Sequence, residues 1–452
     1  MQSVEAYFER KADELGLLND CLKARLSFPT PRSVTDVVRQ KFRLTAALKA
    51  EHALGDWTAT ETAWAPVQHR SGPFEFKYDY QRADLEVRGP SFYDLGAHRT
   101  QQIVYTSSGM AAIAALLFAL AKLVDQGVIF LAPGSYGETR ELIEGYARHL
   151  RPIIHDGVMD EATARSSSCQ LLLVDSSAPA STFETNLRLT RPAVDLLIFD
   201  TTCFSAASGR IRRVIEWAER WRVPLVMVRS HTKLDSLGAE YGRLGSAVFV
   251  DWGKRASAGT GRIFQSLPAE MRNALRLLGG AALPAHFPPF VGTPAYRDLT
   301  DKRMGAILRN TRRAGRYLAN ALPGLTAELR FAHGLYVTLK SAETLSETTA
   351  RRLAATMSED LGRAGLPIRH AGSFGFDFAT TEWFCDPASA QYCIRVSVPD
   401  LPTAFWDELT EAIVRWSLAQ KRHVARSCRF RNSSAISVTS SPSQGSNATM
   451  RK

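Results

Sequence analysis

Cysteine is scarce and scattered in this chain. The 452 residues include six cysteines, and no two of them form a Cys-x-x-Cys pair. A disulfide framework is typical of short secreted chains, and structural zinc sites use closely spaced cysteines. We therefore expect reduced thiols and no metal site. The cysteines stand at positions 21, 169, 203, 385, 393 and 428.

Long apolar runs are also missing. The most apolar stretch, Met110 to Leu120, is soon followed by Lys122 and Asp125, and it falls short of the roughly 18 residues that a membrane span needs. The first residues, MQSVEAYFERK, are charged and contain no apolar segment of the secretory type. These absences predict a cytoplasmic protein with no membrane partner.

Acidic residues are missing from the C-terminal tail. The net charge of the chain is +11, yet seven of its Lys and Arg lie in 421–452, which has no Asp or Glu. Without those seven residues the first 420 positions carry only +4. A nucleic-acid site would need positive charge gathered on a folded surface. We therefore expect no nucleic-acid partner and a basic, Ser-rich, disordered tail over 421–452.

Short apolar runs alternate with helical patterns between about 100 and 250. The runs are nearly unbroken, as expected for strands that are buried on both faces, and they cover 128–132, 171–175, 196–200 and 224–228. Helical spacing lies between them, over 137–150 and 210–222. This β-α-β alternation predicts an α/β fold with a large, mostly parallel sheet.

The sequence on either side of this region predicts N-terminal helices and a second, smaller domain. Two stretches near the N-terminus have helical spacing, and a long helix rich in Arg and Ala is expected over 303–322. Beyond it, the strands LYVTLK and IRVSV alternate with helices over 346–364 and 403–419, which predicts a smaller C-terminal α/β domain. The expected division is an N-terminal helical segment and arm over 1–95, a large domain over 96–285, a small domain over 286–420 and the tail over 421–452.

Three polar motifs stand where such sheets bind ligands, at strand ends and helix starts. Ser108, Gly109 and Met110 open an apolar helix, whose free N–H groups can hold an anion, although Ser is also an ordinary helix cap. Asp200 ends a strand before Thr202; its carboxylate can pair with a cationic ring nitrogen or cap the next helix.

The third motif is Ser230, Thr232 and Lys233, directly after the strand over 224–228. A lysine at the end of a buried strand can serve as a nucleophile, and hydroxyls beside it suit a phosphate, although most lysines are solvated. Pyridoxal phosphate needs an anion site, a carboxylate for its ring nitrogen and a lysine for its aldehyde. The three motifs together predict this cofactor, bound as a Schiff base on Lys233.

The chain resembles the fold-type-I pyridoxal-phosphate enzymes, and most of all the cystathionine synthase and lyase family of Cys/Met metabolism. Its Ser-Gly-Met helix start, Asp-Thr-Thr at Asp200 and Ser-His-Thr-Lys at Lys233 are similar to motifs of that family. Tyr136 in Tyr-Gly-Glu-Thr resembles the family's tyrosine that stacks on the cofactor ring and assists proton transfer. The resemblance implies a large PLP-binding domain followed by a smaller α/β domain.

The resemblance also implies an oligomer with shared sites. Tyr80 and Arg82 are similar to a Tyr-x-Arg motif that reaches the phosphate of the neighbouring subunit, so we expect a homodimer or homotetramer. Arg395 in Arg-Val-Ser-Val resembles the arginine that grips the substrate carboxylate, and Ser373 in Ser-Phe-Gly is similar to a serine beside that carboxylate. A fork-shaped guanidinium suits a carboxylate because it binds both oxygens.

Some family features are absent. The Asn-Pro after the Glu-Ser motif is replaced at Asp175-Ser176-Ser177-Ala178-Pro179, and Gly242-Arg243 resembles aminotransferases, in which such an arginine helps bind phosphate. We expect β/γ-elimination or replacement on a substituted α-amino acid, sulfur-containing ones included, with transamination as the alternative. A noncatalytic protein with the same fold is a third interpretation. His231 either tunes a proton near Lys233 or has a structural role.

Overall fold

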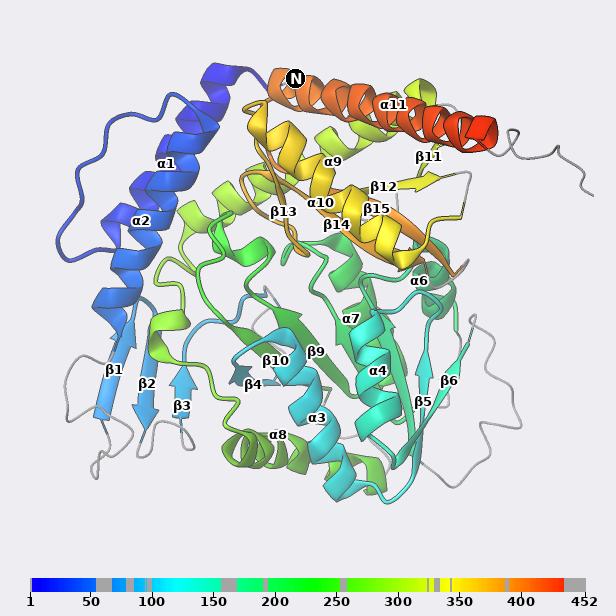
Figure 1. Cartoon of the computed structure of the whole chain (residues 1–452). Coiled ribbons are helices and arrows are strands. Elements are labelled where there is room, and N and C mark those ends of the chain that lie inside the picture. The colour runs from blue at the N-terminus through cyan, green and yellow to red at the C-terminus, as the bar shows by residue number, and fades with distance from the viewer. Residues whose placement is uncertain are drawn as a thin grey trace, which may run out of the picture.

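The polypeptide has three parts: an N-terminal pair of helices with a small sheet, a large α/β body, and a smaller α/β part that carries the last helix (Figure 1). No helix in the described portion of the chain is both long and apolar enough to cross a membrane. The computed structural model describes residues 2–53, 67–78, 85–93, 95, 100–155, 169–189, 194–252, 258–322, 325–328, 334–341, 344–386 and 390–434.

The large body is built on a seven-stranded sheet of order β4-β10-β9-β8-β7-β5-β6. Neighbouring strands from β9 to β6 are parallel, whereas β10 is antiparallel to both β4 and β9. The predicted α/β class with a mostly parallel sheet is therefore confirmed. The strands are β4 (Thr100–Thr106), β5 (Gly127–Leu131), β6 (Leu150–Ile154), β7 (Cys169–Asp175), β8 (Leu196–Asp200), β9 (Leu225–Ser230) and β10 (Gly245–Asp251).

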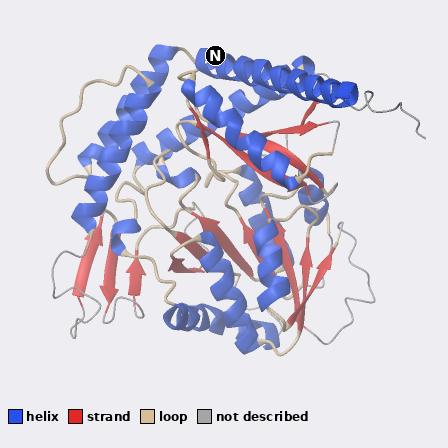
Figure 2. Cartoon of the chain, in the orientation of Figure 1, coloured by secondary structure: helices blue, strands red, loops and turns tan. Residues whose placement is uncertain are grey.

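Both faces of this sheet are covered by helices (Figure 2). In β7, Leu171 and Leu173 pack under α3, α4 and α8, whereas Leu172 and Val174 pack under α6 and α7. This is the alternation of a strand with a period of two, and it explains why the apolar runs in the sequence are unbroken. The helices are α3 (Gly109–Leu123), α4 (Gly137–Tyr146), α6 (Ala180–Leu187), α7 (Gly209–Trp221) and α8 (Ala258–Leu278).

Several predicted helix ends differ from the structure. The helix expected over 137–150 ends at Tyr146, because Leu150 already belongs to the parallel strand β6. The long helix expected from 303 begins at Pro294, where Thr293 caps it by accepting a hydrogen bond from the Tyr296 N–H at 3.2 Å. The end of α4 is thus set by strand pairing and the start of α9 by a cap, and the spacing of apolar residues predicts neither.

The smaller part contains a five-stranded sheet of order β11-β12-β15-β14-β13. Its strands are β11 (Leu325–Glu328), β12 (Tyr336–Ser341), β13 (Ile368–His370), β14 (Ala379–Asp386) and β15 (Gln391–Ser397). Its helices are α9 (Pro294–Ala321), α10 (Glu347–Arg363) and α11 (Thr403–Ser434). Helix α11 continues beyond the end expected near 419, since no Gly or Pro interrupts the sequence there; the tail after 434 lies outside the described residues.

The N-terminal part packs along one flank of the molecule (Figure 1). It consists of α1 (Val4–Asp20), α2 (Val34–His52) and an antiparallel sheet of β1 (Val67–Ser71), β2 (Phe74–Tyr78) and β3 (Leu85–Arg88). Two short 3-10 helices, η2 (Leu234–Ser236) and η3 (Pro284–His286), lie in connecting segments. Leu44, Leu48 and Phe74 belong to a core cluster that also contains Leu237 and Tyr241, so this part packs against the segment that follows Lys233.

Seven buried charges lie where the helices α1, α2 and α9 meet two loops of the smaller part. Lys11 Nζ lies 2.9 Å from Glu14, 2.6 Å from Asp377 and 2.7 Å from Asp400, and its side chain has no exposed surface. Each cation in the group pairs with at least two carboxylates. We call this group the buried ion cluster; its members are Arg10, Lys11, Glu14, Lys41, Arg303, Asp377 and Asp400.

Removing one cation of this cluster should destabilise the fold strongly. The change Arg303→Met removes a cation that contacts Glu14, Asp377 and Asp400, together with its hydrogen bond to the Gly375 carbonyl. It should lower the free energy of unfolding by about 3–5 kcal/mol. The adjacent Lys302 is the matched control: its ion pair with Asp298 lies at the exposed surface, so Lys302→Met should cost less than about 1 kcal/mol. Urea unfolding of both variants measures this, and equal losses would contradict the role of the cluster.

Candidate active site

Lys233 lies just past the end of β9, at the start of η2. Its Nζ donates a hydrogen bond to the Ser373 Oγ at 2.6 Å and lies 5.8 Å from the centre of the Phe374 ring. Gly375 has a φ of 88°, and a Cβ added there would lie 2.6 Å from the Lys233 carbonyl oxygen. The loop from the smaller part can therefore approach Lys233 only because position 375 is glycine.

The N-terminus of α3 approaches the same strand end closely. A Cβ added at Gly109 would lie 2.9 Å from the Ser230 Cβ, so glycine is required for this contact. Ser108 caps α3 by accepting a hydrogen bond from the Ala111 N–H at 3.0 Å, as the alternative interpretation of that motif proposed. The first N–H groups of a helix lack partners within it, and here they lie beside the Ser230 and Thr232 hydroxyls, which are 2.9 Å apart.

Asp200 stands at the end of β8, opposite Asp175 at the end of the parallel strand β7. Its Oδ1 accepts a hydrogen bond from the Thr202 N–H at 2.8 Å. Burial, together with the nearby Asp175 carboxylate, raises the pKa of Asp200 to about 7. Burial also raises the pKa of Asp175, which accepts the N–H groups of Tyr136 and Ser177, each at 2.7 Å. Two adjacent buried carboxylates favour a cationic ligand at this position.

Tyr136 precedes α4 and borders the cavity described below, with 41% of its surface exposed. Burial of the phenol, with Glu138 beside it, raises its pKa above the usual value. The hydroxyl therefore stays protonated at neutral pH and can donate a proton or a hydrogen bond into the cavity. Its backbone is fixed by the hydrogen bond to Asp175.

Arg395 on β15 faces the cavity beside Glu382 of β14. The Arg395 Nη2 lies 2.8 Å from the Glu382 Oε1, and the guanidinium carbon lies 4.0 Å from the Phe384 ring centre and 4.8 Å from that of Tyr336. The arginine that the resemblance assigns to a substrate carboxylate thus already contacts a carboxylate of its own chain.

One cavity of about 320 Å³ brings these groups together. Among the residues predicted from the sequence, those that line it are Ser108, Gly109, Met110, Tyr136, Asp200, Thr202, Ser230, Thr232, Lys233 and Arg395. Ser373 does not line the cavity, but it accepts a hydrogen bond from Lys233, which does. Tyr80 and Arg82 lie outside the described residues, and Arg243 is exposed and does not line the cavity.

His231 belongs to a buried network behind Lys233. Its Nδ1 lies 2.7 Å from Asp235, and its Nε2 lies 2.8 Å from the Ser246 Oγ. Asp235 also accepts two hydrogen bonds from Arg229, at 2.6 and 2.7 Å. Burial alone would raise the pKa of Asp235, but the Arg229 guanidinium holds it well below the usual range. Both ring nitrogens of the histidine are thus engaged with protein groups, which favours the structural role.

Several cavity residues had no individual prediction. Asp175 carried a signal, because it ends the run LLLVD just as Asp200 ends LLIFD, and parallel strands place such ends side by side. Tyr336 and Glu382 stand within strands of the smaller part and have no motif around them. Only the register of β12, β14 and β15 brings them to Arg395.

The residues present fit pyridoxal phosphate. The N-terminus of α3 with the Ser230 and Thr232 hydroxyls offers donors to a phosphate. Asp200, whose pKa is raised to about 7 by burial and by Asp175, gains a partner if a protonated ring nitrogen lies beside it. Lys233 Nζ is the amine that reaches the cavity. Among the described residues, no cluster of His, Cys, Asp or Glu is suited to hold a metal ion.

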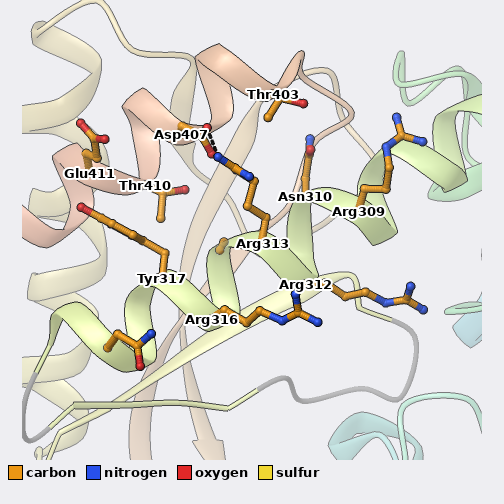
Figure 3. A pocket seen from close by; sticks show the side chains of 12 residues that line it. Arg309, Asn310, Arg312, Arg313, Arg316, Tyr317, Thr403, Asp407, Thr410 and Glu411 are labelled. Atoms are coloured by element: carbon orange, nitrogen blue, oxygen red, sulfur yellow. Dashed lines mark hydrogen bonds and ion pairs between the residues drawn. The ribbon is translucent and has the colours of Figure 1, made fainter. Parts of the chain in front are cut away.

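A larger hollow lies elsewhere, between α9 and α11 (Figure 3). It measures about 700 Å³ and is lined by arginines of α9, of which Arg313 pairs with Asp407 of α11 at 2.5 Å. It contains none of the residues predicted for the site. Although this hollow is larger, it is therefore not the candidate active site.

The chain is similar to MetB from Corynebacterium glutamicum, with a TM-score of 0.50 and 16% identity over 69% of this chain and 80% of that one. The predicted resemblance to the fold-type-I pyridoxal-phosphate enzymes is thereby confirmed at the level of the fold.

Two further solved structures are similar at lower scores. A putative O-acetylhomoserine (thiol)-lyase from Campylobacter jejuni, which contains a pyridoxyl-lysine phosphate, has a TM-score of 0.48 and 14% identity over 69% of this chain and 81% of that one. Cystathionine gamma synthase from Xanthomonas oryzae pv. oryzae has a TM-score of 0.46 and 18% identity over 76% and 88% of the two chains. No protein-family model matches the sequence, and no curated protein matches it.

The raised pKa of Asp200 predicts a pH-dependent penalty on folding. Since its pKa of about 7 in the folded state exceeds the ordinary 3.8, ionisation opposes folding, and the penalty grows as the pH rises from about 4 to about 7. We compare the free energy of unfolding of Asp200→Asn with that of the wild type, both without cofactor. The advantage of the variant should be about 2 kcal/mol larger at about pH 8.5 than at about pH 5.5. Urea unfolding at both pH values measures this, and a pH-independent difference would show that Asp200 is ionised normally.

Proposed function

We propose that the chain binds pyridoxal phosphate through Lys233 and catalyses β/γ-elimination or replacement on a substituted α-amino acid. The observation that supports this most is the single cavity, in which Lys233, Asp200, the start of α3 and Arg395 meet from both α/β parts of the chain. Each supplies a different contact that this cofactor and an amino acid require. A homodimer or homotetramer with shared sites, and a cytoplasmic location, belong to the same proposal.

The bound cofactor supplies an electron sink that lets a proton leave the α-carbon of an amino acid. Lys233, once its amine is free, is placed to take that proton as the general base. Ser373 accepts a hydrogen bond from Lys233 Nζ at 2.6 Å and orients it towards the cavity. Asp200 offers its carboxylate to a ring nitrogen and holds a proton there.

The remaining groups orient the substrate. Arg395 provides the fork-shaped donor for the substrate carboxylate, with its guanidinium held near the rings of Tyr336 and Phe384. Tyr136, whose pKa is raised by burial, stays protonated and can give a proton to a leaving group. The preference for elimination or replacement follows the resemblance at Tyr136 and at Gly109-Met110.

The reaction is tested by a panel of amino acids given to the purified protein with added pyridoxal phosphate. Release of ammonia and a 2-oxo acid from cystathionine, O-acylhomoserine, cysteine or vinylglycine without any acceptor would indicate elimination. Consumption of O-acylhomoserine only when a thiol is added would indicate replacement. A strict need for a 2-oxo acid co-substrate would instead indicate an aminotransferase, and no turnover of any amino acid would favour a noncatalytic protein.

Lys233→Ala should lower this turnover by about 10³-fold, because it removes the general base as well as the amine that holds the cofactor. Lys122→Ala is the control. Lys122 is an exposed residue that pairs with Glu270, and neither residue lines the cavity. Equal activity of the Lys233 variant and the control would overturn the assignment.

A further inference from the structure

Glu382 and Arg395 are directly opposite each other in the antiparallel pair β14–β15. Their side chains lie on the same side of the sheet and form an ion pair of 2.8 Å, each with 13% of its side chain exposed. Opposite charges at such cross-strand positions are held together by the sheet itself. The pair is therefore a fixed feature of the cavity wall.

The guanidinium of Arg395 is confined on two further sides. The rings of Phe384 and Tyr336 lie 4.0 and 4.8 Å from its central carbon. Cation–π contact of this kind orients an arginine plane. The guanidinium of Arg395 is thereby held facing the place where a substrate carboxylate would bind, and the Glu382 carboxylate already takes up part of that place.

Glu382 also faces the interior of the cavity. It lines the cavity with Lys233, and its Oε2 would lie 3.2 Å from a Cβ added at Gly372. Burial raises the pKa of Glu382, while the charges of Arg395 and Lys233 oppose that rise. A carboxylate at this depth needs a cation beside it if it is to stay ionised.

A substrate carboxylate that takes Arg395 would leave Glu382 without its partner. Breaking a largely buried pair in this way is costly, because one charge stays poorly solvated. An α-amino acid carries an ammonium group next to its carboxylate, so it can replace both partners at once. Its carboxylate then pairs with Arg395 and its ammonium with Glu382, and no charge is left alone.

We propose that Glu382 is a specificity-determining residue that receives the ammonium group of an incoming amino acid while Arg395 receives its carboxylate. The inference rests on the proposed function only in taking an amino acid as the substrate class. It makes the site selective for zwitterions over simple carboxylates before any bond to the cofactor forms.

The test uses two ligands of matched shape that cannot react with the cofactor. N,N-dimethylglycine is a zwitterion whose tertiary amine forms no imine, and 3-methylbutanoate is its neutral-headed counterpart with only the carboxylate charge. Isothermal calorimetry on the holoenzyme should show that N,N-dimethylglycine binds about tenfold more tightly, as one partly buried ion pair implies.

In Glu382→Gln this preference should disappear, with 3-methylbutanoate binding more tightly than in the wild type because Arg395 is no longer neutralised. Glu138→Gln is the matched control: Glu138 also lines the cavity, so the variant removes the same charge without touching the pair. It should keep the preference for the zwitterion.

Equal affinity of the two ligands in the wild type would overturn the proposal. So would a preference that survives in Glu382→Gln, or one that is lost equally in Glu138→Gln. These outcomes are independent of turnover, because neither ligand is converted; a protein that fails the amino-acid panel can still show the selectivity, and the reverse also holds.

Discussion

The buried ion cluster is the constraint on which the geometry around Lys233 depends. Its cations reach beyond their carboxylates to the two loops that flank the lysine: Lys41 Nζ donates to the Leu237 carbonyl at 2.5 Å, and Arg303 Nη2 donates to the Gly375 carbonyl at 3.0 Å. Leu237 follows Lys233 along the chain, and Gly375 lies against the Lys233 backbone. The helices α1, α2 and α9 thus hold the lysine loop and the Ser373–Gly375 loop together. The N-terminal helices, which supply none of the predicted site residues, contribute to the site in this indirect way.

Local sequence patterns were sufficient for four neighbouring strands of the large sheet, β5, β7, β8 and β9, and for one half of the site. An unbroken apolar run followed by Asp200 or by Lys233 marks a buried parallel strand and the polar residue at its end, and both features depend on neighbours in the sequence. The ion cluster could not be predicted in this way. Lys11 and Glu14 have the spacing of an ordinary exposed helix pair, and only the packing of α1 against α9 and the smaller part buries them completely.

Arg395 could likewise be predicted from the sequence, whereas its neighbours in the cavity could not. Its motif identified the arginine, but the strand register that places Glu382 opposite it depends on pairing between β14 and β15, which no local pattern specifies. The cavity consequently contains more carboxyl groups than the motifs indicated, with Asp175, Asp200 and Glu382 along its wall. A cationic ring nitrogen beside Asp200 and an ammonium group beside Glu382 would balance two of these carboxylates. The fold is shared with the fold-type-I enzymes, whereas this charge pattern is a property of the chain's own residues.

The most direct measurement of the central claim is to locate the lysine that bonds to the cofactor. Borohydride reduction of the protein with pyridoxal phosphate, followed by proteolysis and peptide mass spectrometry, fixes the cofactor to the amine that carries it. The structure predicts one pyridoxyl group on the peptide containing Lys233, and its loss in Lys233→Ala. A label on any other lysine, or no label above that of denatured protein, would contradict the assignment of this cavity as a pyridoxal-phosphate site.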